Sequence, residues 1–219
     1  MYAKCKHEII TFVDTTVFLG ITIDSRLQWG AQISCLAGKL SSAAFAVNKV
    51  RQLTDVETAR LVYFGYFHSV MSYGILLWGK AADIQTIFVI QKRAIRSIYK
   101  LGARVYLRDR FKEIGILTVA CQYIYSNIIY VKQSIHMYSR NSDTHNINTR
   151  NKHRLVGQYH RLHKVHNSFA GLSVKFFNKV PVNIMDLPLH KFKIVVKNHL
   201  VLKGYYTVNE FFDDKDLWQ

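Results

Sequence analysis

The chain has 219 residues, of which 49% are hydrophobic and 20% charged, so it can bury one sizeable core or two small ones and is not a disordered chain. Thirty Lys and Arg residues oppose fourteen Asp and Glu residues, which gives a formal net charge of +16 at pH 7. This surplus favours a polyanionic partner, either a nucleic acid or an anionic membrane surface. Cys5, Cys35 and Cys121 are too widely spaced for a disulfide framework or a four-cysteine zinc site, and a reducing compartment is expected.

The N-terminal residues 1–26 predict a β-hairpin. Residues 8–12 and 16–23 are short runs rich in β-branched and aromatic side chains, and residues 13–15 separate them as the turn. The chain has only two prolines and eleven glycines, so the rest of the sequence favours long helices. We therefore expect a mainly α fold, in which the hairpin is followed by a helical bundle and a smaller helical C-terminal region.

The bundle is expected within residues 27–139. Apolar residues recur at spacings of three and four over the segment before Thr54, which is typical of a helix that buries one face. Thr54 is followed three residues later by Glu57, the spacing of a capping box, and a second, antiparallel helix should begin there. Thr118 is the expected cap of a later helix that runs to about Tyr138.

The helix expected to follow Asp83 and to end at Leu101 presents the most informative surface. At 100° per residue its apolar side chains fall on one side, and four cations fall within an arc of roughly 100° on the other. These cations are Lys92, Arg93, Arg96 and Lys100, and the basic stretch continues through Arg104 and Arg108. Together with the net charge, this pattern indicates a phosphate-binding face; the alternative is an ordinary solvated helix face.

Residues 140–168 are polar, basic and rich in histidine, which predicts a linker. Their candidate nucleic-acid-binding cations are Arg150, Lys152 and Arg154. His160, His163 and His166 are three residues apart, so a helix would rotate the outer pair by about 120° around its axis. Because no Cys, Asp or Glu lies nearby to complete a zinc site, we expect no bound metal here.

The C-terminal residues 169–219 predict two short helices, the second of which begins at Pro188 as a first helical position. Thr207 and Glu210 form another capping box. The segment 211–214 superficially resembles the metal-binding box of a polymerase. Two-metal chemistry requires such a pair on a rigid hairpin, and we expect instead a frayed, solvated tail.

Other catalytic machinery is not evident. No serine lies in a nucleophile elbow and no glycine-rich phosphate loop occurs. Residues 61–79 and 114–131 lack Asp, Glu, Lys and Arg and approach the length of a membrane span. Both contain polar groups that would need partners in lipid, so no membrane is expected; a basic two-span membrane protein is the alternative reading.

Several blocks of sequence occur in a characteristic order. They are FLGITIDSRLQW (18–29), SVMSYGILLWGKA (69–81), IQKRAIRSIY (90–99), FKEIGILTVACQYIYSNIIYVKQ (111–133) and YYTVNEFF (205–212). Together they resemble the region downstream of the active-site hairpin in jockey-like non-LTR retrotransposon reverse transcriptases. The resemblance implies a primer-grip hairpin followed by the helical thumb, with RNA, RNA/DNA hybrid or DNA as partner.

The resemblance assigns Phe18, Leu19 and Gly20 to the primer grip, where a glycine lets nucleic acid approach the backbone closely. The catalytic aspartates of the family lie upstream of this hairpin, and Asp14 is the only aspartate before Phe18 in this sequence. We therefore expect no catalytic residue and no cofactor in this chain, since Mg²⁺ would belong to the missing palm. The palm and fingers of the parent polymerase are expected partners. The protein is expected to lie inside the cell, in the cytoplasm or nucleus. The alternative is a non-functional transposon relic.

Overall fold

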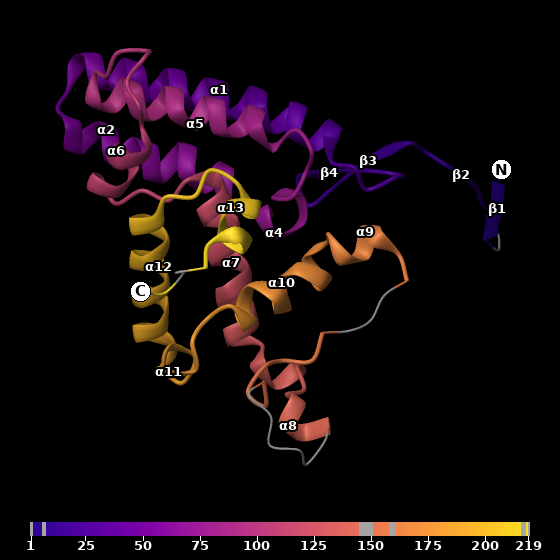
Figure 1. Ribbon diagram of the computed structural model, residues 1–219. Helices are drawn as coiled ribbons and strands as arrows, with labels where there is room; N and C mark the ends of the chain where they lie inside the picture. The colour runs from indigo at the N-terminus through magenta and orange to yellow at the C-terminus, as the bar shows by residue number, and fades with distance from the viewer. Residues whose placement is uncertain (1, 6–7, 145–150, 158–160, 216–217, 219) are drawn as a thin grey trace. The chain divides into compact units, whose positions relative to one another are not determined.

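The computed structural model describes residues 2–5, 8–144, 151–157, 161–215 and 218, and it is mainly helical, as expected (Figure 1). The chain divides into two compact units. Unit 1 comprises Met1–Gly74 and Ala81–Ile98, and unit 2 comprises Ile75–Lys80 and Tyr99–Gln219. This division differs from the four parts expected from the sequence, because the helices on both sides of the expected linker belong to unit 2.

Unit 1 begins with two hairpins rather than one. In antiparallel pairs, β1 (Tyr2–Cys5) joins β2 (Glu8–Thr11), and β3 (Thr15–Phe18) joins β4 (Ile21–Asp24). The predicted pairing of residues 8–12 with residues 16–23 is therefore wrong. The second turn lies at Leu19 and Gly20, whose φ angles of 48° and 76° are the left-handed values of a two-residue hairpin loop.

The first long helix is α1 (Gly30–Leu53), which lies in the segment before Thr54 whose apolar periodicity predicts a helix. The carboxylate of Asp24 accepts hydrogen bonds from the backbone N–H groups of Gln28 and Trp29, at 2.8–3.0 Å, and holds the preceding loop. These bonds, chiefly the one from Gln28, lower the pKa of Asp24. The helix buries the expected stripe of Ile33, Leu36, Leu40, Ala43, Ala44 and Val47.

The second helix, α2 (Val56–Val62), begins one residue later than predicted. Asp55 is its N-cap, and Oδ1 of this residue accepts a hydrogen bond from the Thr58 N–H at 2.8 Å. Thr54 instead ends α1, where its hydroxyl donates to the Val50 carbonyl oxygen at 2.8 Å. The cap is therefore the carboxylate, and the capping box predicted at Thr54 is wrong.

The charge-free stretch 61–79 is not a continuous helix. It passes from α2 through a π-helix, η1 (Tyr63–His68), to the short helices α3 (Ser69–Ser72) and α4 (Ile75–Trp78). Gly74, with φ at 64°, interrupts the path before α4. Among the residues that the structure describes, no helix has both the length and the apolar composition needed to cross a membrane.

The last helix of unit 1 is α5 (Ile84–Tyr99), which is fastened to the helices before it by two polar contacts. The Arg51 Nε donates to the Ile98 carbonyl oxygen at 2.8 Å, joining the end of α1 to the end of α5. Within the core, the Gln91 Nε2 lies 3.1 Å from the Tyr63 hydroxyl of η1. Burial raises the pKa of Tyr63, so this phenol is a neutral, hydrogen-bonded core residue.

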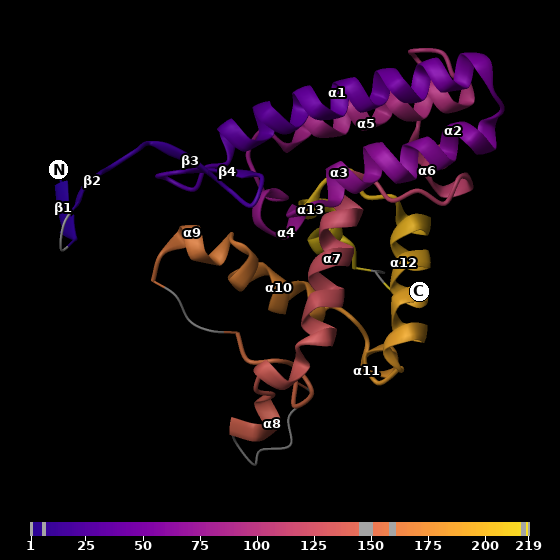
Figure 2. The ribbon, with the colours of Figure 1, turned by 180° about the vertical axis from the view of Figure 1, so that it is seen from behind.

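Unit 2 is built around α7 (Val119–Gln133), which packs against α4, α10 (Phe169–Asn178), α12 (Leu189–Lys203) and α13 (Val208–Asp213). Figure 2 shows this arrangement from behind. Thr118 caps α7 as predicted, because its hydroxyl oxygen accepts from the Cys121 N–H at 3.1 Å. The helix ends at Gln133, short of the predicted Tyr138, and is followed by the short η2 (Ile135–Met137).

Four shorter helices complete the described part of unit 2. They are α6 (Arg108–Glu113), α8 (Asn141–Thr144), α9 (His163–His166) and α11 (Val182–Met185). Pro188 is the N-cap of α12, one position before the first helical place that was predicted for it. The aromatic core of the unit contains Phe111, Tyr123, Phe176, Phe192 and Phe211, all at most 1% exposed.

Candidate nucleic-acid interface

The helix α5 separates apolar and basic side chains as its sequence predicts. Its buried residues are Ile87, Phe88, Ile90, Gln91, Ala94, Ile95 and Ile98. Lys92, Arg93 and Arg96 project from the remaining arc, where Arg93 is exposed and the other two are half-buried. The 16 residues of α5 include no Asp or Glu, so no carboxylate of the helix itself neutralises this basic arc.

A contact within α5 orders one cation of the basic arc, and the helix dipole favours another. The Lys92 Nζ lies 4.6 Å from the centroid of the Phe88 ring, a cation–π arrangement that fixes the lysine stem along the helix. Arg96 lies in the last turn of α5, where the partial negative charge of the helix dipole favours positive side chains. The arc therefore presents three cationic donors that suit phosphate oxygens.

Lys100 does not extend this row on the helix. The helix ends at Tyr99, and Lys100 takes the left-handed conformation with φ at 50°. The prediction that the helix continues to Leu101 is therefore wrong, because Lys100 already takes the left-handed conformation that often follows the last residue of a helix. Lys100 is exposed and belongs to unit 2.

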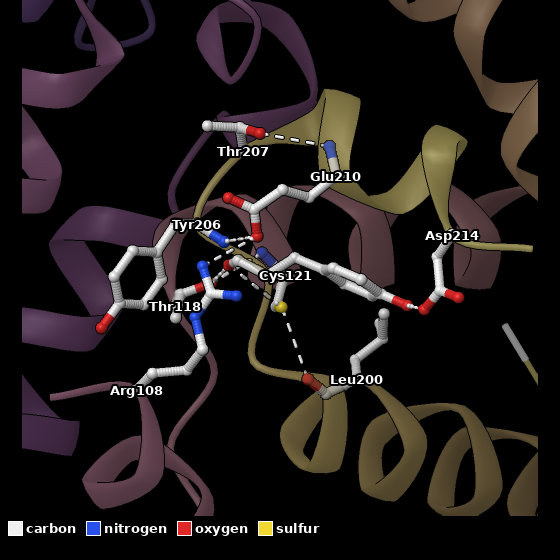
Figure 3. Close-up of polar contacts among 9 residues, drawn as sticks. Arg108, Thr118, Cys121, Leu200, Tyr206, Thr207, Glu210 and Asp214 are labelled. Carbon is white, nitrogen blue, oxygen red and sulfur yellow. Dashed lines mark hydrogen bonds and ion pairs between the residues drawn. The ribbon is translucent and has the colours of Figure 1, made fainter. Parts of the chain in front are cut away.

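The basic residues after α5 are largely engaged within unit 2. The Arg108 Nη2 lies 3.0 Å from the Glu210 Oε2, and its guanidinium lies 4.4 Å from the centroid of the Tyr206 ring (Figure 3). Arg110 and Lys112 form ion pairs with acidic residues of the same helix, at 2.6 and 3.4 Å. Arg104 is exposed in the turn before α6. We therefore centre the candidate interface on α5, and Arg108 stabilises the fold.

Glu210, the partner of Arg108, forms one half of the predicted capping box with the N-cap Thr207, whereas its carboxylate bonds the residue before the N-cap and not the N-cap N–H. Its backbone N–H donates to the Thr207 Oγ1 at 3.2 Å, and its Oε2 accepts from the Tyr206 N–H at 3.1 Å. Figure 3 shows this cluster beside the start of α7. There the Thr118 hydroxyl donates to the Tyr205 carbonyl oxygen at 2.5 Å. The C-terminal segment is thus fastened to α6 and α7.

The segment 211–214 is ordered, so the predicted frayed tail is wrong. Phe211 is fully buried, and Phe212 stacks on Phe176 with ring centroids 5.0 Å apart. The Asp214 carboxylate accepts a hydrogen bond from the Tyr205 hydroxyl at 2.5 Å and pairs with the Lys203 Nζ at 3.0 Å. This aspartate therefore contributes to packing in unit 2.

Cys121 lies within the same cluster and is an inert thiol. Its Sγ is buried and lies 3.4 Å from the Leu200 carbonyl oxygen and 3.5 Å from that of Tyr205 (Figure 3). Burial raises the pKa of Cys121 to about 12. Because the thiolate is the nucleophilic form, this cysteine is not a candidate for covalent chemistry.

The hairpin assigned to a primer grip by resemblance presents an apolar tip. Phe18 and Leu19 are 63% and 73% exposed. The Leu19 carbonyl oxygen accepts a hydrogen bond from the Tyr73 hydroxyl at 2.6 Å, which ties the tip to unit 1. Gly20 faces open space, with no atom within 4 Å of the position a side chain would occupy. The backbone at the tip is therefore accessible to a ligand.

The second predicted basic cluster is only partly described. Lys152 is half-buried and Arg154 is exposed, whereas Arg150 lies outside the described residues, as does His160 of the histidine series. The loop holding Lys152 and Arg154 is attached to Arg140 by an isolated β-bridge at Leu155. In the part of the chain that the structure describes, no group of three or more His, Cys, Asp or Glu residues is placed to hold a metal ion.

Sequence reasoning did not identify the Arg108–Glu210 pair or the buried Gln91–Tyr63 contact. The two partners of the ion pair are 102 positions apart, so no local pattern connects them. Comparisons with models of protein families, with curated proteins and with solved structures found no match to this chain.

Proposed function

We propose that the chain binds the backbone of RNA or of an RNA/DNA duplex through Lys92, Arg93 and Arg96, without sequence preference. The supporting observation is the basic arc of α5, which contains no carboxylate and lies opposite a buried face. Cations held at fixed positions on a helix can contact successive phosphates. Cations that contact phosphates and not base edges recognise the charge and shape of a duplex and not its sequence.

The broader proposal is that this chain represents the C-terminal part of a jockey-like reverse transcriptase, with the bond-making aspartates and Mg²⁺ in a palm outside this sequence. The exposed side chains of β3 support a missing partner, because a two-stranded hairpin is marginally stable alone. Val17 is 68% exposed and Phe18 63% exposed. In this proposal they contact the palm and fingers of the parent polymerase.

The salt dependence of binding tests the duplex proposal. Fluorescence anisotropy with a labelled RNA/DNA duplex gives the association constant between about 50 and 200 mM salt. If three phosphates are neutralised by the α5 cations, the logarithm of this constant falls with the logarithm of salt concentration at a slope of about −3. A slope near zero contradicts the proposal.

A matched pair of double variants locates the surface. Lys92→Gln/Arg93→Gln should reduce the steepness of the salt slope by about two. The control, Lys39→Gln/Lys49→Gln, removes the same charge from exposed positions of α1 in the same unit and should leave the slope unchanged. Circular dichroism verifies that both variants fold. If the salt slope became less steep by the same amount in both double variants, net charge and not the α5 surface would be responsible for binding.

A further inference from the structure

A cavity of about 260 Å³ lies in unit 2, between the loop that contains Arg154 and the segment that joins α10 to α11. Three of its lining residues are cationic or ionisable, namely His153, Arg154 and Lys179. Three others are apolar, namely Val180, Val182 and Met185. A water molecule occupies about 30 Å³ and sites for drug-sized ligands begin near 300 Å³, so the cavity suits a small organic ligand.

The walls of the cavity are fixed by hydrogen bonds to buried elements. The side-chain amide of Asn178 accepts from the Leu155 N–H at 2.8 Å and donates to the Leu155 carbonyl oxygen at 2.9 Å. Leu155 is 3% exposed, which anchors the loop next to Arg154. At another lining residue, the Lys132 ammonium donates to the Met185 carbonyl oxygen. These bonds hold the backbone next to Arg154 and at Met185.

The charge of the lining indicates an anionic ligand. No Asp or Glu belongs to the lining residues that the structure describes. The Lys179 Nζ donates one hydrogen bond, to the Phe212 carbonyl oxygen at 2.5 Å, and a lysine ammonium carries three protons. Arg154 is exposed at the rim and supplies a planar fork of donors that matches a phosphate.

We propose that this cavity binds a single nucleotide as its 5′-monophosphate. The phosphate lies with His153, Arg154 and Lys179, and the base lies against Val180, Val182 and Met185. The volume exceeds what inorganic phosphate fills, and the apolar wall gives a base a surface to contact. This inference goes beyond the proposed duplex binding and does not depend on it, since the cavity residues belong to unit 2 and the α5 cations to unit 1.

Calorimetric titration of the full chain tests the ligand class. The probes are the four ribonucleoside 5′-monophosphates, with ribose 5-phosphate, adenosine and inorganic phosphate for comparison. At least one nucleotide should bind at least tenfold more tightly than each of these three fragments, because only a nucleotide carries both a phosphate for the cationic lining residues and a base for the apolar ones. Equal binding of inorganic phosphate, ribose 5-phosphate or adenosine overturns the proposal, as does the absence of nucleotide binding at millimolar concentration.

Variants then locate the site with the nucleotide that binds best. Arg154→Gln should weaken its affinity about tenfold, since a charge-assisted hydrogen bond is lost. Val182→Glu, which places a carboxylate in the lining, should weaken it further. Lys175→Gln removes an exposed charge of α10 outside the cavity and should have no effect; a loss equal to that of Arg154→Gln overturns the proposal.

The double variant Lys92→Gln/Arg93→Gln separates this proposal from the proposed duplex binding. It should leave the nucleotide affinity unchanged, whatever its effect on the affinity for the duplex. A matching loss of nucleotide affinity would place the nucleotide at α5 and overturn the cavity assignment.

Discussion

At the scale of single residues, His199 of α12 is a half-buried basic group that folding keeps neutral. Its ring stacks on Trp218 with centroids 4.1 Å apart, and its Nε2 is buried without a hydrogen-bond partner among the described residues. Burial, with a smaller contribution from the charge of Lys203, lowers the pKa of His199 to about 4, whereas Asp214 acts in the opposite direction. Folding and protonation of this histidine therefore oppose each other.

This opposition predicts a loss of stability in acid. The unfolded chain binds the proton near pH 6.5 and the folded chain only near pH 4, so the contribution of His199 is complete above pH 6.5 and declines as the pH falls toward 4. Thermal unfolding at pH 7.5 and pH 5.0 should show a smaller acid-induced drop in Tm for His199→Leu than for the natural chain. His190→Leu, an exposed control on the same helix, should keep the full drop. If both variants respond alike, His199 is not the group responsible.

At the scale of elements, the turn between β3 and β4 places a leucine where the backbone favours other residues. The φ angle of Leu19 is 48°, a left-handed value that costs a β-carbon residue roughly 1–2 kcal/mol. Asparagine tolerates this conformation, and Asn-Gly is a favoured pair for two-residue hairpin loops. The exposed tip at Leu19 is thus maintained at a cost to stability.

Leu19→Asn should therefore raise the free energy of unfolding by about 0.5–1 kcal/mol, because it relieves the strain at this position. Urea denaturation measures the change. Leu19→Ala is the matched control: it removes the same exposed apolar side chain but keeps a residue that is disfavoured in the left-handed region, so no gain is expected. A gain of similar size in Leu19→Ala would attribute the effect to lost apolar exposure.

At the scale of the whole molecule, the C-terminal segment is part of the core of unit 2. Phe211 is fully buried, in edge contact with Phe176 and Tyr205 at centroid distances of 5.6 and 5.7 Å. The aromatic contacts attach the C-terminal segment to the core of unit 2, and the Arg108–Glu210 ion pair attaches it to α6. Stability of unit 2 should therefore depend on residues beyond 210.

Phe211→Ala should lower the free energy of unfolding of unit 2 by about 3–5 kcal/mol, because it removes a buried ring and leaves a cavity. Denaturation followed by far-UV circular dichroism measures this loss. Leu202→Ala, at a position 66% exposed on α12, should change stability by about 0.5 kcal/mol or less. A small effect of Phe211→Ala would mean that the segment does not contribute to the core.

The sequence by itself determined features that depend on residues within a few positions of one another. The two-sided composition of α5 and the caps at Thr118 and Thr207 are of this kind, because helical periodicity and capping act over one or two turns. Where two local structures both fit the nearby sequence, the sequence did not decide between them. Thr54 and Asp55 could each have been the N-cap of α2, and the strands on either side of residues 13–15 could have paired with different partners.

Only the tertiary structure decided which charges are engaged internally and which segments are buried. Arg108 and Arg93 belong to the same basic stretch of sequence, yet Arg108 pairs with Glu210 and Arg93 is exposed on α5. The order of residues 211–214 and the cavity at Arg154 likewise arise from packing between distant segments. The physical reason is that burial and ion pairing depend on which residues lie close together in space. The spacing of residues along the sequence does not show which distant residues will be close.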